Sequence, residues 1–148
     1  MISESADYKY SISSIINRSG RLLSNKLNKT FSEKGYKITR EQWITLSVLT
    51  DEKGITQQEL ADKGFKNKAS ITSLIDHMEA NNLVIRSSDK KDRRIKRIYL
   101  TKEGEDLYVK LTKSAYTVID KAVKNIDEDD LQKSIDILNK IINNLTTV

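Results

Sequence analysis

Residues 56–101 decide the fold, and they read TQQELADKGFKNKASITSLIDHMEANNLVIRSSDKKDRRIKRIYLT. The segment opens on a capping box, because Thr56 can accept a hydrogen bond from the amide three residues on, while Glu59 reaches back to the first amide. Gly64 suits the left-handed position that ends a first short helix. Asn67 can cap a second helix. Two helices joined by a tight turn predict a helix-turn-helix.

The second helix of this unit has one apolar face and one polar face. Its apolar residues recur at intervals of three and four, and they are Ile71, Leu74, Ile75 and Met78. Asn81-Asn82 ends the helix. At 100° per residue the opposite face carries small or polar side chains, which are Ala69, Thr72, Ser73 and Asp76, with Ser70 and His77 on one flank and Lys66 and Lys68 at the N-terminal end.

Two β-rich segments follow, Leu83–Arg86 and Ile95–Leu100, and residues 87–94 between them are all polar. This pattern predicts a β-hairpin with a long tip. A helix-turn-helix followed by such a hairpin is a winged helix. Residues 86–97 hold seven cations and two anions, a net charge of +5, which equals the formal net charge of the whole chain. The basic hairpin is therefore expected to contact a phosphate backbone.

Helical segments flank the winged unit. Residues 8–34 carry one apolar stripe, Thr39 opens a second capping box with Gln42, and helices are expected from Thr101 and from Asp127 onward. Ile55 is expected to add a short strand beside the wing. The stripes near both termini are more extensive than a small domain needs, which predicts a dimer interface made by Ile12, Ile16, Leu131, Ile135, Leu138, Ile142 and Leu145.

Composition excludes several classes of protein. The 148 residues include no proline, no cysteine and a single histidine, His77. Disulfides, thiolate metal sites and thiol-based redox sensing are therefore ruled out, and a histidine-rich metal site is too. No nucleophile–base pair or glycine-rich phosphate loop is present, so neither an enzyme nor a cofactor is expected. Without a membrane-length apolar run or a visible signal peptide, we expect a cytoplasmic protein.

Three motifs carry a resemblance to a known family. They are Leu74–Glu79 at the end of the second helix, Asp92–Arg94 in the hairpin, and Leu100–Gly104 after it. Their order and spacing resemble those of the MarR family of bacterial transcription regulators. The resemblance implies a mainly α fold with a small β-hairpin wing. It also implies one domain over residues 1–148, with a DNA-binding winged helix-turn-helix at 39–100 and a helical dimerisation region at 8–34 and 101–148.

The candidate contacts with double-stranded DNA lie on the second helix and in the wing. They are Lys66, Lys68, Ala69, Ser70, Thr72, Ser73, His77, Lys90, Lys91, Asp92, Arg93 and Arg94. Asp92 is placed to hold Arg94 extended toward a minor groove. Many relatives carry a basic residue at the position of Ser73 and an arginine at that of His77. The wing must therefore supply more of the electrostatic attraction here.

Each candidate has a plainer interpretation. The polar helix face and the hairpin tip are also what ordinary solvated surfaces look like, and His77 is more often a surface residue without a special task. Trp43 is the candidate for lining a pocket that binds a small aromatic or phenolic effector. Trp43 and the aromatic residues near it are more often simply core.

Three functions compete. The leading one is a homodimeric, sequence-specific DNA-binding regulator, a ligand-responsive repressor that binds an inverted-repeat operator. The second is a winged-helix module that binds another protein, against which the +5 charge of the wing argues. The third, an enzyme, has no supporting motif. Selection of duplexes from a random pool separates the first two.

Overall fold

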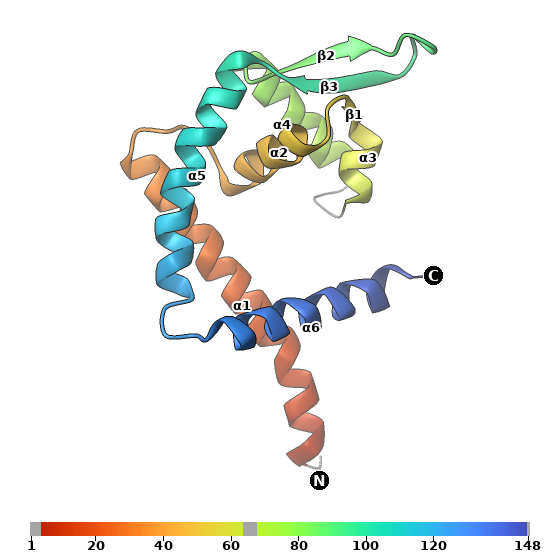
Figure 1. Ribbon diagram of the computed structural model, residues 1–148. Helices are drawn as coiled ribbons and strands as arrows, with labels where there is room; N and C mark the ends of the chain where they lie inside the picture. The colour runs from red at the N-terminus through yellow and green to blue at the C-terminus, as the bar shows by residue number, and fades with distance from the viewer. Residues whose placement is uncertain (1–3, 64–67, 148) are drawn as a thin grey trace.

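The computed structural model describes residues 4–63 and 68–147, with side chains for 10–63 and 69–147. The helices are α1 (Glu4–Glu33), α2 (Arg40–Asp51), α3 (Gln57–Asp62), α4 (Lys68–Ala80), α5 (Lys102–Ala122) and α6 (Glu128–Thr146). The strands are β1 (Ile55–Thr56), β2 (Val84–Ser88) and β3 (Lys96–Leu100). Figure 1 shows the hairpin of β2 and β3 projecting beyond the helices at one end of the molecule, with the start of α1 and all of α6 away from it. This arrangement confirms the predicted winged helix with long flanking helices.

The three strands form one antiparallel sheet in the order β1-β3-β2. Ile98 at the centre of β3 pairs with Ile55 of β1 and with Arg86 of β2. The predicted strand at Ile55 is confirmed. The hairpin strands differ from the prediction, since β2 continues through Ser87 and Ser88, while Ile95 is exposed outside β3. Backbone pairing needs no apolar side chain, so two serines extend the ladder.

Caps define the helix ends largely as the sequence predicts. Both capping boxes form, at Thr39 with Gln42 and at Thr56 with Glu59. Asn82 ends α4 with a φ of 57°, which asparagine tolerates better than most residues. The N-terminal helix begins at Glu4 rather than at Tyr8. The predicted roles of Gly64 and Asn67 lie outside the described residues.

The core is built from side chains of the sheet and of helices α1 to α5. Its buried members are Leu27, Phe31, Leu46, Leu49, Ile55, Leu60, Ile71, Ile75, Met78, Leu83, Val84, Ile98, Leu111, Ala115 and Val118. Burial of each large side chain contributes about 1.5–3 kcal/mol relative to exposure. The predicted stripe of α4 is thus the inner face of that helix. It leaves the polar face of the same helix outside.

The terminal helices bury little of their apolar surface within the chain. No residue of α6 is buried, and Ile135, Leu138, Ile142 and Leu145 are exposed, as are Ile12 and Ile16 of α1. Leu131 is half-buried. Within one chain, therefore, the apolar stripe of α6 is not covered, and the predicted dimer interface stays a prediction. Among the described residues, no helix combines the length and apolar character that crossing a bilayer requires.

Candidate nucleic-acid interface

The outer face of α4 gathers most of the predicted helix contacts. Ala69, Thr72, Ser73 and His77 are exposed and Ser70 is half-buried, because Ile71, Ile75 and Met78 anchor the opposite face in the core. Lys68 is the first residue of α4. Lys66 lies outside the described part of the chain. The helix thus presents small polar side chains, the kind that can reach base edges in a major groove.

One flank of α4 is held by Arg86 of β2. Its guanidinium donates to Glu79 Oε2 and to Asp76 Oδ1, both at 2.6 Å, and to Gln57 Oε1 at 3.0 Å. Gln57 Nε2 in turn donates to Thr72 Oγ1 at 3.0 Å. The Arg86 side chain is only 19% exposed. This arrangement, which we call the Arg86 network, fixes α4 against α3 and the wing.

The Arg86 network corrects the charge assigned to the wing. Arg86 is one of the seven cations of residues 86–97, but its charge is offset by two carboxylates of α4. Arg97 is also engaged, donating to Asp89 Oδ2 at 2.5 Å and to the Gly54 carbonyl at 2.8 Å. Both arginines therefore hold the winged helix together through ion pairs and hydrogen bonds within the chain.

Asp89 organises the loop at the wing tip. Besides Arg97, its carboxylate accepts the amide of Lys91 at 2.7 Å and that of Asp92 at 3.2 Å. These hydrogen bonds, the one from Arg97 foremost, lower the pKa of Asp89 to about 2. The tip is therefore a shaped loop, anchored through Arg97 to the carbonyl that precedes β1.

The predicted pairing of Asp92 with Arg94 is present at the tip. Arg94 Nε donates to Asp92 Oδ1 at 3.1 Å, and Nη2 donates to Oδ2 at 3.0 Å. Hydrogen bonds from Arg94 lower the pKa of Asp92 below its usual range. The Arg94 side chain is still 91% exposed. Lys90, Lys91 and Arg93 are exposed too, and none forms an ion pair with the described residues.

The other flank of α4 borders a cleft. A cleft of about 500 Å³ separates it from the start of α2 and is lined by Lys37, Thr39, Glu41, Gln42, Ser70, Ser73, Leu74 and His77. Sequence reasoning found the helix side of this cleft but missed Lys37. It also missed the structural roles of Gln57, Glu79, Asp89 and Arg97. Lys37 lies in a loop, and no periodic pattern connects a loop residue to a helix 40 residues on.

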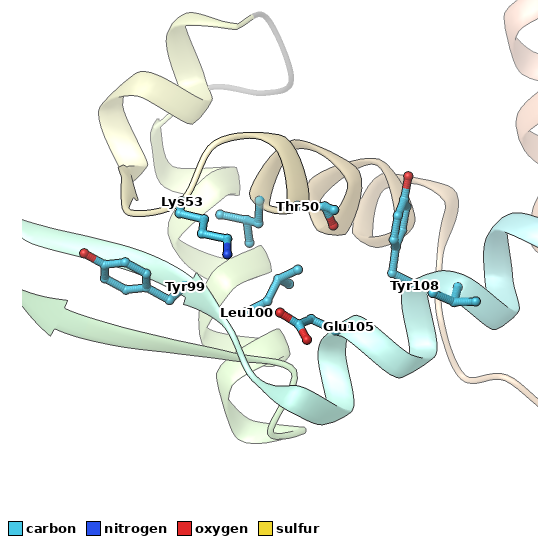
Figure 2. A pocket seen from close by; sticks show the side chains of 8 residues that line it. Thr50, Lys53, Tyr99, Leu100, Glu105 and Tyr108 are labelled. Carbon is cyan, nitrogen blue, oxygen red and sulfur yellow. The ribbon is translucent and has the colours of Figure 1, made fainter.

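Trp43 is part of the packed interior. Its indole N–H donates to Thr112 Oγ1 at 3.1 Å, and its ring meets Phe31 edge-on with centroids 6.1 Å apart. Further along the same contact between α2 and α5 lies a cavity of about 440 Å³, lined by Leu49, Thr50, Lys53, Tyr99, Leu100, Glu105, Tyr108 and Val109. Figure 2 shows Lys53 between the rings of Tyr99 and Tyr108, with Glu105 on the α5 side. Trp43 does not line this cavity, so an effector pocket at Trp43 stays a prediction.

Comparison with known proteins decides the family. A family model described as the MarR family matches residues 36–95, which run from the loop before α2 through the wing tip. This match places residues 36–95, the winged helix-turn-helix region, in the MarR family. Its relatives are named as transcription regulators, in agreement with the prediction that it is not an enzyme.

Two relatives show how far the likeness to known regulators extends along the chain. An uncharacterized HTH-type transcriptional regulator of Bacillus subtilis, YsmB, is 37% identical over 94 residues, which are 64% of this chain and 58% of that protein. The chain thus aligns with little more than half of the length of that relative. The HTH-type regulator SarZ of Staphylococcus epidermidis is 25% identical over 121 residues, 80% of each chain.

Solved structures agree on the fold. The transcriptional regulator BldR from Sulfolobus solfataricus superposes with a TM-score of 0.86 at 21% identity, covering 96% of this chain and 99% of that one. A putative MarR family regulator from Listeria monocytogenes, crystallised with a 26mer DNA, superposes with a TM-score of 0.81 at 24% identity, covering 90% and 87%. At these identities the likeness establishes the fold alone.

Proposed function

We propose that this chain is a homodimeric, sequence-specific DNA-binding repressor that recognises an inverted-repeat operator and is released by a small ligand. The observation that carries the proposal is the pairing of an outward polar helix face with an exposed basic wing tip in one winged helix. The Listeria relative crystallised with DNA supports duplex DNA as the partner.

The helix and the wing have different tasks in this proposal. Thr72 and Ser73 on α4 contact base edges and select sequence. Lys90, Lys91 and Arg93 at the tip contact phosphates, which supplies affinity that falls with salt. Arg94, held by Asp92, enters the minor groove, where narrow A·T-rich sequence attracts a guanidinium.

The unburied terminal helices support the two-fold symmetry of this proposal. The exposed apolar residues of α1 and α6 need a covering surface, and a second copy supplies one that is self-complementary. A two-fold dimer places its recognition helices in successive major grooves. The operator is then an inverted repeat with half-site centres about 10 base pairs apart.

The ligand arm of the proposal rests on the cavity between α2, β3 and α5. Its volume of about 440 Å³ and its mixed apolar and polar lining suit a small aromatic or phenolic molecule. Two solved structures support this class of effector. DNA binding by BpsR from Bordetella bronchiseptica is regulated by 6-hydroxynicotinic acid, and CouR from Rhodococcus jostii was crystallised with p-coumaroyl-CoA.

Selection of bound duplexes from a random pool tests the DNA arm. We expect a palindromic consensus, and affinity for it should fall steeply between two salt concentrations. Lys90→Ala and Lys91→Ala should weaken binding to operator and random DNA alike. A pool that yields no enriched sequence, with no duplex binding at physiological salt, would indicate a protein-binding module instead.

Tryptophan fluorescence tests the ligand arm, because Trp43 lies on the same α2–α5 contact as the cavity. Titration with small aromatic acids should give saturable changes that Lys53→Met weakens, and the same acids should release the operator. Lys113→Met, exposed on α5 outside the cavity, is the matched control. In vitro transcription from a template that carries the selected site tests repression.

A further inference from the structure

The flank of α4 that borders the cleft has the chemistry of an anion-contact site. The cleft between α4 and the start of α2 is lined by one ammonium group, three hydroxyl groups and one imidazole, from Lys37, Thr39, Ser70, Ser73 and His77. Lys37 and His77 are exposed, and neither forms an ion pair with the described residues. A single carboxylate, that of Glu41, also lines the cleft.

The start of α2 adds to this character. Thr39 Oγ1 accepts the Gln42 amide at 3.3 Å, which leaves the hydroxyl proton of Thr39 available to a further acceptor. The positive end of the α2 dipole lies at the same place. Glu41 lies in the first turn, where a carboxylate favours the helix itself. The cleft therefore offers donors to an acceptor group that approaches from solvent.

The cleft lies on the side of α4 opposite to the Arg86 network. Ser70, Ser73 and His77 share one flank at helical spacing, whereas Thr72, Asp76 and Glu79 share the other. The second flank is occupied by Gln57 and Arg86. A helix that lies in a major groove has a phosphate strand on each side. The wing lies next to the flank held by Arg86 of β2, so it can contact only the phosphate strand on that side.

We infer that the cleft contacts a DNA phosphate on the strand away from the wing, with Lys37 as its cation and with Thr39 and His77 as hydrogen-bonding groups. This inference rests on the proposed function and adds a contact outside the recognition helix and the wing. Because phosphates carry no base identity, the contact positions α4 in the groove and leaves sequence choice to the outer face.

Lys37→Ala tests the inference on the full-length chain with the selected operator. One lost phosphate contact should lower the slope of log affinity against log salt by about 1. Affinity at 0.1 M salt should fall about tenfold, and equally for operator and random DNA. Lys113→Ala, which removes the same charge from the exposed surface of α5, should leave slope and affinity unchanged.

Phosphate ethylation interference locates the contact. With the wild-type protein, ethylation of one phosphate per half-site should reduce binding, and with Lys37→Ala ethylation of that phosphate should have no effect. This phosphate should lie on the strand opposite the one whose phosphates stop interfering in Lys90→Ala. His77→Gln, which keeps one hydrogen-bonding group, should weaken interference at that same phosphate.

The outcomes separate the inference from the function beneath it. If the wild-type protein binds no duplex, the proposed function fails. If it binds and Lys37→Ala matches the wild type in slope and interference pattern, the cleft makes no phosphate contact and the inference is wrong. Thermal unfolding of Lys37→Ala should match that of the wild type, because the side chain is exposed.

Discussion

Helices α4 and α6 both carry apolar side chains at alternating intervals of four and three residues, but the side chains are buried in α4 and exposed in α6. In α4 the stripe of Ile71, Ile75 and Met78 is at most 1% exposed. In α6 the stripe runs through Ile135, Leu138 and Ile142, and Ile142 is 55% exposed. Strand β2 and helix α3 pack against α4, whereas no residue of α6 is buried within the described chain.

The difference separates two uses of one pattern. An apolar stripe at helical spacing predicts that one face of the helix is buried. It does not predict whether the residues that pack on that face come from the same chain or from a second one. In the winged-helix part, both the apolar core and the polar network around Arg86 are formed by residues of the same chain. The α6 stripe is left for another surface. Substitutions in the two parts should therefore fail in different ways.

The largest effect is expected at α6. Leu138→Asp or Ile142→Asp puts a charge in the stripe, and we expect loss of the dimer together with a loss of operator affinity of roughly 100-fold or more, because each half-site then binds alone. Sedimentation and operator binding measure both. Asn144→Asp adds the same charge to the opposite face of α6 and should change neither. A folded wild-type monomer at micromolar concentration would refute the assignment.

Next comes the polar network of the closed part. Arg86→Met leaves Asp76 and Glu79 without their cation and Gln57 without its partner, and we expect a loss of about 1.5–3 kcal/mol in the free energy of unfolding. DNA binding should weaken as well, because Asp76 regains an unpaired charge on the outer face. Chemical denaturation measures the first effect. Arg93→Met, at the exposed tip, removes the same charge and should leave unfolding unchanged.

The sequence predicts what depends on local spacing and misses what depends on where elements cross. Stripes, capping boxes and the hairpin are periodic or contiguous, so Thr39, Thr56 and Ile98 could be assigned in advance. Arg86 and Asp76 are 10 residues apart and Arg97 and the Gly54 carbonyl 43 apart. The first pairing forms only when β2 packs against α4, and the second only when β1 pairs with β3. The charge count of the wing was correct, but a count does not show which cations are already paired, as Arg86 and Arg97 are.

A pair of glycines extends the comparison to the backbone. A Cβ on Gly104, at the start of α5, would overlap the carbonyl oxygen of Leu83, whereas a Cβ on Gly20 of α1 meets nothing within 4 Å in this chain. Gly104→Ala should therefore destabilise the protein by about 1–3 kcal/mol. Gly20→Ala should stabilise it by about 0.5–1 kcal/mol through helix propensity. Thermal unfolding measures the change in stability of each variant. A change in the same direction for both variants would contradict the predicted difference between Gly104 and Gly20.

The smallest effect, and the sharpest in sign, is expected at Asp92. Asp92→Asn removes a negative charge from a basic wing, so simple electrostatics predicts tighter DNA binding. The geometry predicts the reverse. Asp92 Oδ1 accepts from Arg94 Nε and from its amide, and Oδ2 accepts from Nη2. An asparagine keeps one acceptor and turns an NH₂ group toward another donor.

Arg94 should then leave its extended orientation, and operator affinity should fall severalfold at two salt concentrations, with reduced preference for A·T pairs beside the half-sites. Because the pKa of Asp92 is lowered, its carboxylate is charged at every pH above about 4, the ordinary pKa of an aspartate. Its pairing with Arg94 is lost only when the pH falls through the lowered pKa. The contrast between Asp92→Asn and wild type should therefore be constant from about pH 6 to 8. Asp120→Asn on α5 controls for net charge. Tighter binding by Asp92→Asn at both salt concentrations would mean that Asp92 only repels DNA and does not orient Arg94.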